Sequence, residues 1–504
     1  MAANGNRVPI PGTQREVWPS ATPVADVGSG DVFLTAWLRP RRGGALDIAR
    51  ARALGAAPPK QRSYDDRANL IERTGADPAD LDAFSRYCSQ LKIDVVASHW
   101  RSVIVSAPID RLIDAFGATA AICELPDKRR FRHRSGSLHA SPEIAEMLTG
   151  LFGIHQWPRS HAIGALHGHT VAPSPRDTAS RYSFPDADGS GQTIAILQLR
   201  GAFRADDFAS NASAQGIAAQ TPIVKRVDNA ELEHGIETDK DVESAMDTQI
   251  VAAFAPGAQI VIYAAPDDAR GVLDAIRKAI FDTDDPSSIL SISFGYPERL
   301  WTPAALTILD ELFTAAALLG ISVFCAAGDN GAELDENGNP HVLAPASCEF
   351  VHACGGTEIA PDGTTEAAWA KTGGGFSAVH AAPPWQTAVP ALAAQYKVRA
   401  GRGIPDFAAE VMPGYPICFE GTQMAAGGTS AIAPLWSALT ARINQRLGKA
   451  VGFFAPFLYG AAPGLFREIR SGANDRFSAG PGWNPCSGLG VPIGDAIERA
   501  LGGS

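Results

Sequence analysis

The feature that most constrains the fold is a repeated change of hydrophobic pattern in the second part of the chain. Beyond about residue 182, short and continuously apolar segments alternate with longer segments of helical spacing. Continuous apolar runs of about four to eight residues are typical of strands buried on both faces. Alternation of such strands with helices predicts a doubly wound, mainly parallel α/β sheet. The expected strands are 193–199, 259–264, 289–293 and 321–326, and the expected helices are 241–254, 267–281, 303–319 and 430–447.

The first part of the chain is organised differently. Its short segments alternate between strand and helix patterns, which predicts a small α+β domain of ferredoxin-like type over residues 1–158. Residues 159–181 are rich in His, Gly, Pro, Ser and Arg, and this composition predicts an exposed, cleavable linker before a domain at 182–504. The expected elements of the first domain are strands 31–38, 102–106 and 121–125 and helices 78–91 and 109–116.

Length and composition exclude several classes of protein. A chain of 504 residues is too long for one hydrophobic core. The net charge of −11 argues against nucleic acid as a partner, and the basic run 128–134 is predicted to be a solvated, protease-sensitive loop. No apolar segment approaches the roughly 20 residues that cross a bilayer, so no membrane span is expected. Seven cysteines without Cys-x-x-Cys spacing indicate neither a disulfide scaffold nor a zinc site.

Four residues are candidates for chemistry. The turn Gly-Gly-Thr-Ser at 427–430 opens a long apolar helix and places the Ser430 hydroxyl beside unpaired backbone N–H groups that can hold an oxyanion. Glu243 and Asp247 are four residues apart, and therefore share one face of a helix. Asp329 follows an apolar strand directly. Each residue alone has a plainer interpretation, as a helix cap or a surface group.

Six motifs in this order resemble the sedolisin family of serine-carboxyl peptidases, in particular its kumamolisin-like members. The resemblance covers nearly the whole chain and implies an N-terminal pro-domain followed by a subtilisin-like catalytic domain. The motifs are the Glu-x-x-x-Asp helix that ends in Ala-Pro-Gly-Ala at 255–258, Ala-Ala-Gly-Asp at 326–329, Ala-Cys-Gly-Gly-Thr at 353–357, Thr-Gly-Gly-Gly at 372–375, Gly-Arg-Gly-Ile-Pro-Asp at 401–406 and Gly-Gly-Thr-Ser-Ala at 427–431.

The resemblance implies a role for each candidate: Ser430 as nucleophile, Glu243 as general base, Asp247 as the group that orients Glu243, and Asp329 as the oxyanion-hole side chain. The chemistry agrees with these roles in acid. A carboxylate base matches acidic pH, and two adjacent carboxyl groups titrate as a unit. Asp329 can donate a hydrogen bond to an oxyanion only when it is protonated. Activity is therefore expected to peak in acid.

Two positions depart from the family pattern. Gln198 stands where kumamolisin-like enzymes have a glutamate linked to the triad, and Phe294 stands where they have a tryptophan. Because the predicted triad itself is intact, these changes predict a shifted pH profile or preference and not an inactive protein. Backbone at 293–295 and 373–375 is expected to pair with an extended peptide substrate.

The resemblance further implies a structural calcium ion near the C-terminus, held by two aspartates and backbone carbonyls. One aspartate is replaced by Glu468 and the other by Asn484. Both side chains offer oxygen ligands, but the longer arm and the lost charge predict weaker binding. The matching positions are Glu468, Ile469, Gly480, Gly482 and Asn484.

The sequence admits three alternatives. A Ser-His-Asp mechanism using His167 or His169 is disfavoured, because both precede the first strand of the predicted catalytic domain and subtilisins place the aspartate before the histidine. An α/β-hydrolase esterase would need a Gly-x-Ser-x-Gly elbow, which Ser430 lacks. A noncatalytic peptide-binding relative of the same fold remains as the alternative function.

The sequence therefore predicts an acid-active serine endopeptidase that is made as a self-processing zymogen. Its expected partners are a protein or peptide substrate and its own pro-domain, which would act as an intramolecular inhibitor. A monomer is expected. Secretion is inferred from the family and from acid chemistry, since residues 1–19 show no signal-peptide pattern.

Overall fold

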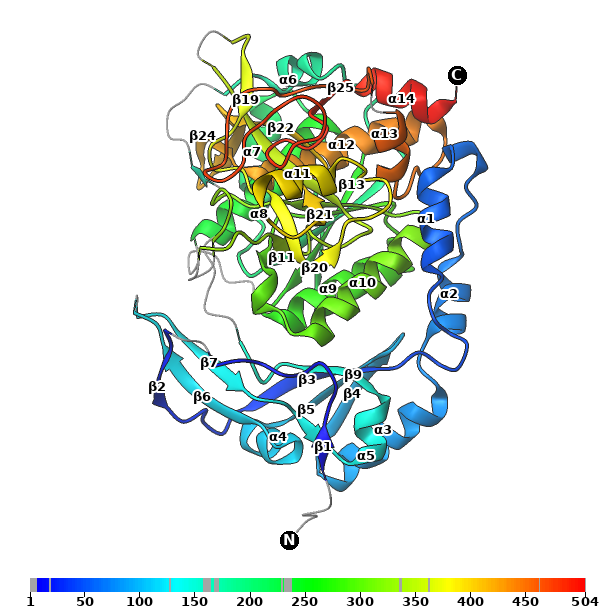
Figure 1. The fold of residues 1–504 in the computed structure, drawn as a ribbon, viewed down its shortest axis with the longest axis vertical. Coiled ribbons are helices and arrows are strands. Elements are labelled where there is room, and N and C mark those ends of the chain that lie inside the picture. Colours follow the sequence, from blue (N-terminus) through cyan, green and yellow to red (C-terminus); the bar gives the residue numbers. More distant parts are fainter. Residues whose placement is uncertain are drawn as a thin grey trace.

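The computed structural model describes residues 7–17, 20–126, 128–156, 165–166, 172–227, 230, 238–334, 338–360, 363–461 and 463–503. The described elements form a smaller N-terminal unit and a larger C-terminal unit. In Figure 1 the smaller unit lies below the larger one. Among the described helices, none is long and apolar enough to cross a membrane. The predicted boundary at 158–159 lies outside the described residues.

The larger unit is built on one central sheet. Its strand order is β12-β13-β11-β14-β16-β18-β19, and β22 pairs with β18. Neighbouring strands from β12 to β18 are parallel, and β19 is antiparallel to β18. The mainly parallel sheet predicted from the apolar runs is confirmed. The strands are β11 (Thr193–Leu199), β12 (Ile223–Arg226), β13 (Gln259–Ala265), β14 (Ile289–Ile292), β16 (Ser322–Ala326), β18 (His352–Ile359), β19 (Glu366–Ala368) and β22 (Phe407–Met412).

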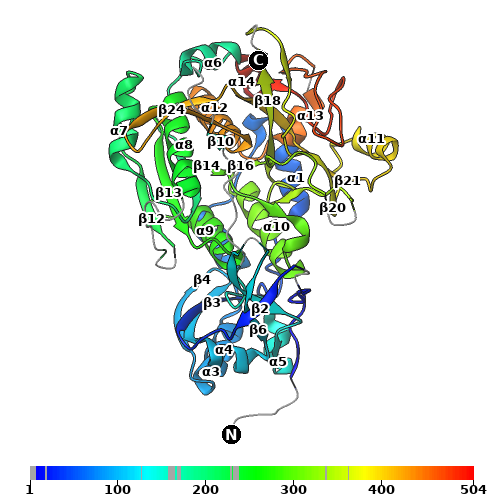
Figure 2. The same ribbon diagram turned by 90° about the vertical axis from the view of Figure 1, so that its left-hand side faces the viewer.

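Helices cover both faces of this sheet. Helices α8 (Thr238–Phe254) and α12 (Thr429–Leu447) pack on one face, and α9 (Ala269–Phe281) and α10 (Pro303–Leu318) pack on the other (Figure 2). Successive side chains of a strand point to opposite faces. Within β11 this alternation sends Ile194 and Ile196 into the core under α8 and α12. It sends Ala195, Leu197 and Leu199 into the core under α9 and α10. Burial on both faces explains why β11 reads as a continuous apolar run.

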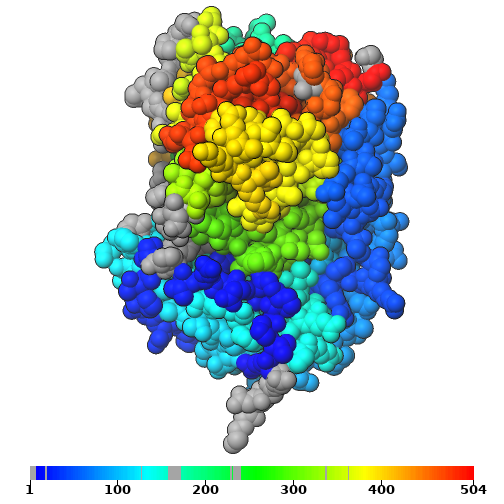
Figure 3. Space-filling model, viewed as in Figure 1, coloured from blue at the N-terminus to red at the C-terminus, as the bar shows by residue number. Residues whose placement is uncertain are grey.

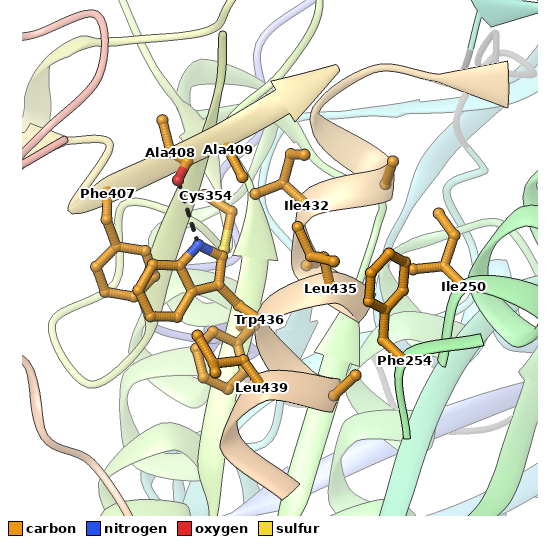
Figure 4. Close-up of a cluster of buried hydrophobic side chains, with 14 of the residues drawn as sticks. Ile250, Phe254, Cys354, Phe407, Ala408, Ala409, Ile432, Leu435, Trp436 and Leu439 are labelled. Atoms are coloured by element: carbon orange, nitrogen blue, oxygen red, sulfur yellow. Dashed lines mark hydrogen bonds between the residues drawn. The ribbon is translucent and has the colours of Figure 1, made fainter. Parts of the chain in front are cut away.

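Packing around Trp436 fixes helix α12 (Figure 4). The Trp436 ring stacks on Phe407 with centroids 3.8 Å apart, and its Nε1 donates to the Ala408 carbonyl at 3.5 Å. On the same helix, Leu435 points toward Ile250 and Phe254 of α8. The N-terminal half of α12 is therefore held between the sheet and α8.

The smaller unit contains a four-stranded antiparallel sheet in the order β4-β5-β3-β9. This is the strand order of ferredoxin-like βαββαβ folds. Its own core joins the sheet to α3 and α4. The elements are β3 (Asp31–Leu38), α3 (Pro78–Gln90), β4 (Asp94–His99), β5 (Ser102–Pro108), α4 (Ile109–Phe116) and β9 (Leu148–Phe152).

The two units share an interface in which the smaller sheet faces α9 and α10 (Figures 1 and 2). Trp37 of β3 and Phe152 of β9 belong to the same buried cluster as the apolar side chains of these helices. Polar contacts cross the interface as well. Thr35 Oγ1 donates to Asp274 Oδ2 at 2.6 Å, and Arg101 Nη1 lies 2.8 Å from Glu311 Oε2.

Helices α1 (Ile48–Ala56) and α2 (Arg67–Thr74) were not predicted. They leave the smaller unit and run up one side of the larger unit, where they appear in blue in Figure 3. Buried contacts tie this segment down: Arg62 Nη1 donates to the Phe453 carbonyl at 2.9 Å, and Arg67 Nε donates to the Ile280 carbonyl at 2.9 Å. We call residues 48–74 the strap.

The prediction of a solvated loop at 128–134 is wrong. Residues Arg130–Ser135 form strand β7, which pairs with β6 (Thr119–Glu124). Arg132 is buried and donates from Nε to the Ile154 carbonyl at 2.6 Å, and Arg134 donates from Nη2 to the Thr13 carbonyl at 2.7 Å. The guanidinium groups of Arg132 and Arg134 donate hydrogen bonds to backbone carbonyls, so these two charged side chains lie inside the protein and not in solvent.

The end of the predicted linker forms helix α6 (Pro175–Arg181), which packs on the larger unit through Thr178 Oγ1, 2.7 Å from Glu410 Oε1.

Short elements complete the fold. They are β1 (Val8–Pro9), β2 (Thr22–Ala25), η1 (Pro59–Gln61), β8 (His139–Ala140), α5 (Pro142–Met147), β10 (Ala165–Leu166), α7 (Ala205–Ala214), β15 (Tyr296–Pro297), η2 (Glu298–Leu300), β17 (Leu343–Ala344), β20 (Gly375–Ala381), α11 (Val389–Tyr396), β21 (Gly401–Ile404), β23 (Tyr415–Phe419), β24 (Thr422–Gly427), α13 (Ala455–Ala461), β25 (Phe466–Arg467), β26 (Val491–Pro492) and α14 (Gly494–Gly502).

Candidate active site

Ser430 is the second residue of α12 and is buried. The helix begins after Gly428, whose φ of 112° is open to glycine but strained for other residues. Ser430 Oγ donates to the carbonyl of Ser293, the residue that follows β14, at 3.1 Å. The glycine turn thus brings the helix N-terminus to the carboxyl end of the sheet, where ligands bind in open α/β folds.

A proline within α12 changes the hydrogen bonding of Ser430. Pro434 lacks the N–H that would bond to the Ser430 carbonyl four residues earlier. That carbonyl instead lies 3.1 Å from Ser293 Oγ, which is also 2.7 Å from Asp247 Oδ1. A serine hydroxyl has one hydrogen. Both contacts are hydrogen bonds at once when Asp247 is protonated and donates to Ser293, which then donates to Ser430.

Glu243 and Asp247 lie one turn apart on α8, and both are buried. Burial raises the pKa of each carboxyl well above its usual value. The neighbouring Asp247 charge raises the pKa of Glu243 further, and the nearby Ser430 hydroxyl offsets part of this rise. Among the described residues, no well-aligned hydrogen bond reaches either Glu243 oxygen. Glu243 is therefore a buried carboxyl beside Ser430 with unused capacity to accept a proton.

Asp329 faces the same helix end from the loop after β16. Its Oδ1 accepts hydrogen bonds from Thr429 N at 2.8 Å and from Thr429 Oγ1 at 2.7 Å. Its Oδ2 is buried without a hydrogen-bond partner in the described part of the chain. Burial raises the Asp329 pKa to about 7, although the Thr429 bonds act in the opposite direction. Below that pH, Oδ2 can carry a proton and act as a donor.

The structure thus brings Ser430, Glu243, Asp247 and Asp329 to one place. It also adds residues that the sequence analysis missed. Ser293 links Asp247 to the backbone of Ser430, as described above. Lys240, one turn before Glu243, is buried with Nζ 4.5 Å from the Phe294 ring centroid and 3.4 Å from Asp267 Oδ2. A lysine three residues before a predicted base was the available sequence signal.

Gln198 is anchored away from the carboxyl pair. Its Oε1 accepts from Ser244 Oγ at 2.8 Å, and its Nε2 donates to the backbone carbonyls of Arg200 and Gly201 at 3.0 and 2.8 Å. The amide therefore braces α8 against the end of β11.

Close packing accounts for two glycines of the 373–375 run. A Cβ on Gly373 would lie 2.0 Å from the Ala327 carbonyl oxygen, and a Cβ on Gly374 would lie 2.0 Å from the Pro485 carbonyl oxygen. Substrate pairing at this run stays a prediction.

Part of the predicted linker lies beside the Gly-Gly-Thr-Ser turn at 427–430. Strand β10 pairs antiparallel with β24, with Ala165 opposite Gly427 and Leu166 opposite Ala426. Because Gly427 is three residues before Ser430, this backbone runs along the segment that leads into α12. His167 and His169 lie outside the described residues.

The predicted calcium ligands do not fit a calcium ion in this arrangement. The Glu468 carboxylate pairs with Arg470, whose Nη2 lies 2.7 Å away. The Asn484 amide nitrogen lies among the carbonyls that would hold the ion. An N–H donor carries a partial positive charge, whereas a cation needs oxygen ligands around it. It donates at 3.3, 3.1 and 3.4 Å to the carbonyl oxygens of Ile469, Gly480 and Gly482 respectively.

No family model matches the chain, but individual proteins do. The chain is 34% identical over 530 residues to kumamolisin from Bacillus sp. (strain MN-32), covering 98% of this chain and 96% of that protein. It is 25% identical to sedolisin from Pseudomonas sp. (strain 101), covering 80% of this chain and 77% of that protein.

Among solved structures, Pseudomonas sedolisin, a serine-carboxyl proteinase complexed with two molecules of pseudo-iodotyrostatin, matches with a TM-score of 0.57 and 24% identity. The match covers 67% of this chain and 98% of that chain. With the parallel sheet described above, it confirms the predicted α/β, subtilisin-like fold of the larger unit.

Proposed function

Because the chain belongs to the sedolisin family and is a serine peptidase, we propose that it is an acid-active serine-carboxyl endopeptidase made as a self-processing zymogen. The observation that carries this proposal is the meeting of Ser430, Glu243 and Asp329 at the first turn of α12. A hydroxyl, an unpaired carboxyl and a second carboxyl with a raised pKa can supply the nucleophile, the general base and the oxyanion donor of acyl transfer.

In the proposed reaction, Ser430 Oγ turns from the Ser293 carbonyl toward Glu243, which takes its proton as Oγ attacks the substrate carbonyl. Protonated Asp329 donates from Oδ2 to the oxyanion of the tetrahedral intermediate. Glu243 then returns the proton to the leaving amine, and water releases the acyl group by the same steps. Asp247 shares a proton with its neighbours and holds Glu243 in place. No step uses a metal ion.

The pH dependence follows from these protonation states. Asp329 must be protonated, so activity is lost as pH rises through its pKa of about 7. The carboxyl pair must hold one proton and not two, so activity is also lost as pH falls through the lower of the two raised pKa values of the pair. A bell-shaped profile on the acid side of neutrality is expected. Export to acidic surroundings belongs to the same proposal, because the enzyme would be idle at higher pH.

The proposed zymogen has the smaller unit as its intramolecular inhibitor. Strand β10 supports this, because a linker strand along β24 leaves less room for a substrate at Ser430. Protonation of Glu311 cannot release the smaller unit from the larger unit in acid. Burial raises the Glu311 pKa when the two units are in contact, so protonation of this carboxyl favours the contact. The strap and the larger unit are also joined by the ion pair of Arg52 with Glu349, 2.5 Å apart.

Mass analysis of the acid-treated chain with a denatured protein substrate tests the proposal. The wild-type chain should shorten itself and the substrate, whereas Ser430→Ala should remain at full length and leave the substrate intact. Processing of Ser430→Ala at the normal rate would refute self-cleavage. A wild-type chain that retained the substrate without shortening it would instead be the noncatalytic peptide-binding relative.

A further inference from the structure

A second cluster of reactive side chains lies between α10 and β20. Asp310 comes from α10, Cys348 from the segment between β17 and β18, and His380 from β20. One donor atom from each of the three side chains lies within 4.8 Å of the other two. Cys348 is fully buried, the His380 side chain is 10% exposed, and the Asp310 side chain is 42% exposed. The cluster is therefore closed on the protein side and open to solvent at Asp310.

His380 is held in the orientation of a metal ligand. Its Nδ1 lies 3.2 Å from Glu298 Oε1, and Glu298 is fixed in turn by the Ser377 hydroxyl and by Ala378 N at 3.0 Å. The other nitrogen, Nε2, points into the cluster, 3.3 Å from Asp310 Oδ2. Metal-bound histidines almost always have a carboxylate or carbonyl on the far nitrogen, which sets the ring and its tautomer. Glu298 occupies that position here.

From this geometry we propose that Asp310, Cys348 and His380 form a binding site for a divalent transition-metal ion, with zinc as the best match. Thiolate, imidazole and carboxylate together are ligands that zinc accepts, and a solvent molecule on the Asp310 side completes four-coordination. Ligand atoms around tetrahedral zinc stand roughly 3.5 Å apart, given Zn–ligand distances of about 2.0–2.3 Å. The three donor atoms lie within 4.8 Å of one another, so small side-chain rotations would bring them to this separation.

Two further observations support a metal over a purely internal ion pair. Asp310 Oδ1 is a buried atom without a hydrogen bond among the described residues, and His380 Nε2 has no well-aligned hydrogen bond there beyond its 3.3 Å ion-pair contact with Asp310 Oδ2. A bound cation would satisfy both, and the Cys348 thiol would bind as a thiolate with its proton released to solvent. The three ligands come from separate elements, so they leave none of the close Cys and His spacings by which zinc sites are found in sequences.

Cobalt binding to the full-length chain tests the site. The Ser430→Ala background prevents proposed self-processing, and metal is first removed with a chelator at neutral pH. Cobalt(II) should bind in one equivalent, with the near-ultraviolet charge-transfer absorption of a cobalt–thiolate bond, and zinc should displace it. In this background, Cys348→Ser should abolish the absorption and His380→Ala should weaken binding at least about tenfold, since one of three ligands is lost.

Cys88→Ser is the matched control, because Cys88 is a buried thiol of the smaller unit; it should bind cobalt as the parent does. If the variants at Cys348 and His380 fail to fold, Asp310→Asn, at the exposed edge, should still fold and bind more weakly. The absence of the cobalt–thiolate absorption from the parent would overturn the proposal. Equal binding by the parent and the Asp310, Cys348 and His380 variants would overturn it too.

Discussion

Two buried carboxyl sites in the larger unit are equally hidden from solvent but differ in their hydrogen bonds. Asp406 is paired with buried Arg402 at 2.9 Å, and it also accepts from Ala353 N at 2.8 Å and from the Tyr459 hydroxyl at 2.9 Å. Arg402 in turn donates to backbone carbonyls, among them that of Val351 at 2.8 Å. Every charge at this site has a partner.

The Ser430 site is the opposite. Glu243 is as buried as Asp406, but no well-aligned hydrogen bond reaches the Glu243 carboxyl oxygens in the described part of the chain. Asp329 accepts hydrogen bonds there through only one of its two carboxyl oxygens. An unpaired buried carboxyl lowers stability, whereas a fully paired one holds segments in place. The difference separates a group kept available for proton transfer from a group that fixes the fold.

The largest expected effect comes from Glu243→Gln. Activity on a denatured protein in acid should fall by at least about 10⁴-fold, as for other residues that act as a unit with the nucleophile. The melting temperature should stay or rise, because an unpaired buried carboxyl is removed. Steady-state proteolysis and thermal unfolding measure the two effects. Retained activity with a large loss of stability would place Glu243 with Asp406 as a structural group.

Arg402→Met should give the reverse pattern. Asp406 would lose its charged partner, which lowers the free energy of unfolding by about 3–5 kcal/mol. The remaining folded protein should keep its kcat. Denaturant titration with active-site titration of the folded fraction checks this, and Arg402→Met with Asp406→Leu should recover part of the lost stability. A kcat loss larger than the loss of folded protein would contradict the comparison.

Asp329 provides a graded test. Asp329→Ala removes the proposed oxyanion donor and should lower kcat by about 10²–10³-fold. Asp329→Asn keeps a donor that does not titrate, so its activity should persist as pH rises through 7, where the wild type loses activity. Profiles of kcat against pH for the three proteins measure the effect. An identical alkaline limb in wild type and Asp329→Asn would show that another group controls it.

The smallest effect is expected at Asn484, a neutral buried group that is fully bonded like Asp406. A chelator should not change the melting temperature of the wild type, because the amide nitrogen already satisfies the three carbonyls. Asn484→Asp places a negative charge there and should make the melting temperature rise by a few degrees with calcium, by mass action on the folded state. Chelator sensitivity of the wild type would restore the original calcium prediction.

The sequence predicted what depends on local pattern and on motifs. The run at 193–199 matches strand β11 at both ends, because a strand buried on both faces has an unmistakable composition. The motif residues Glu243, Asp329 and Ser430 are indeed close neighbours, since the carboxyl ends of parallel strands meet at one edge. Their catalytic roles stay predictions until the variants are measured.

What the sequence missed depends on partners distant along the chain. The strap has no strong apolar stripe, and Arg62 and Arg67 hold it through carbonyls far away in sequence. Arg132 appeared exposed for the same reason. The position of the Asn484 amide among three carbonyls was equally hidden, because composition gives ligand types but not which atom occupies the centre.

The strap has a consequence for how an enzyme of this design would become active. Before any cut in the linker, the proposed inhibitor and the Ser430 site belong to one molecule, so the effective concentration of the inhibitor does not change on dilution. After the proposed cut, the contacts of Arg62, Arg67 and the shared core would still hold the N-terminal fragment, and its departure would become an ordinary dissociation. A dilute preparation should therefore gain activity more completely than a concentrated one, even when both are cleaved to the same extent.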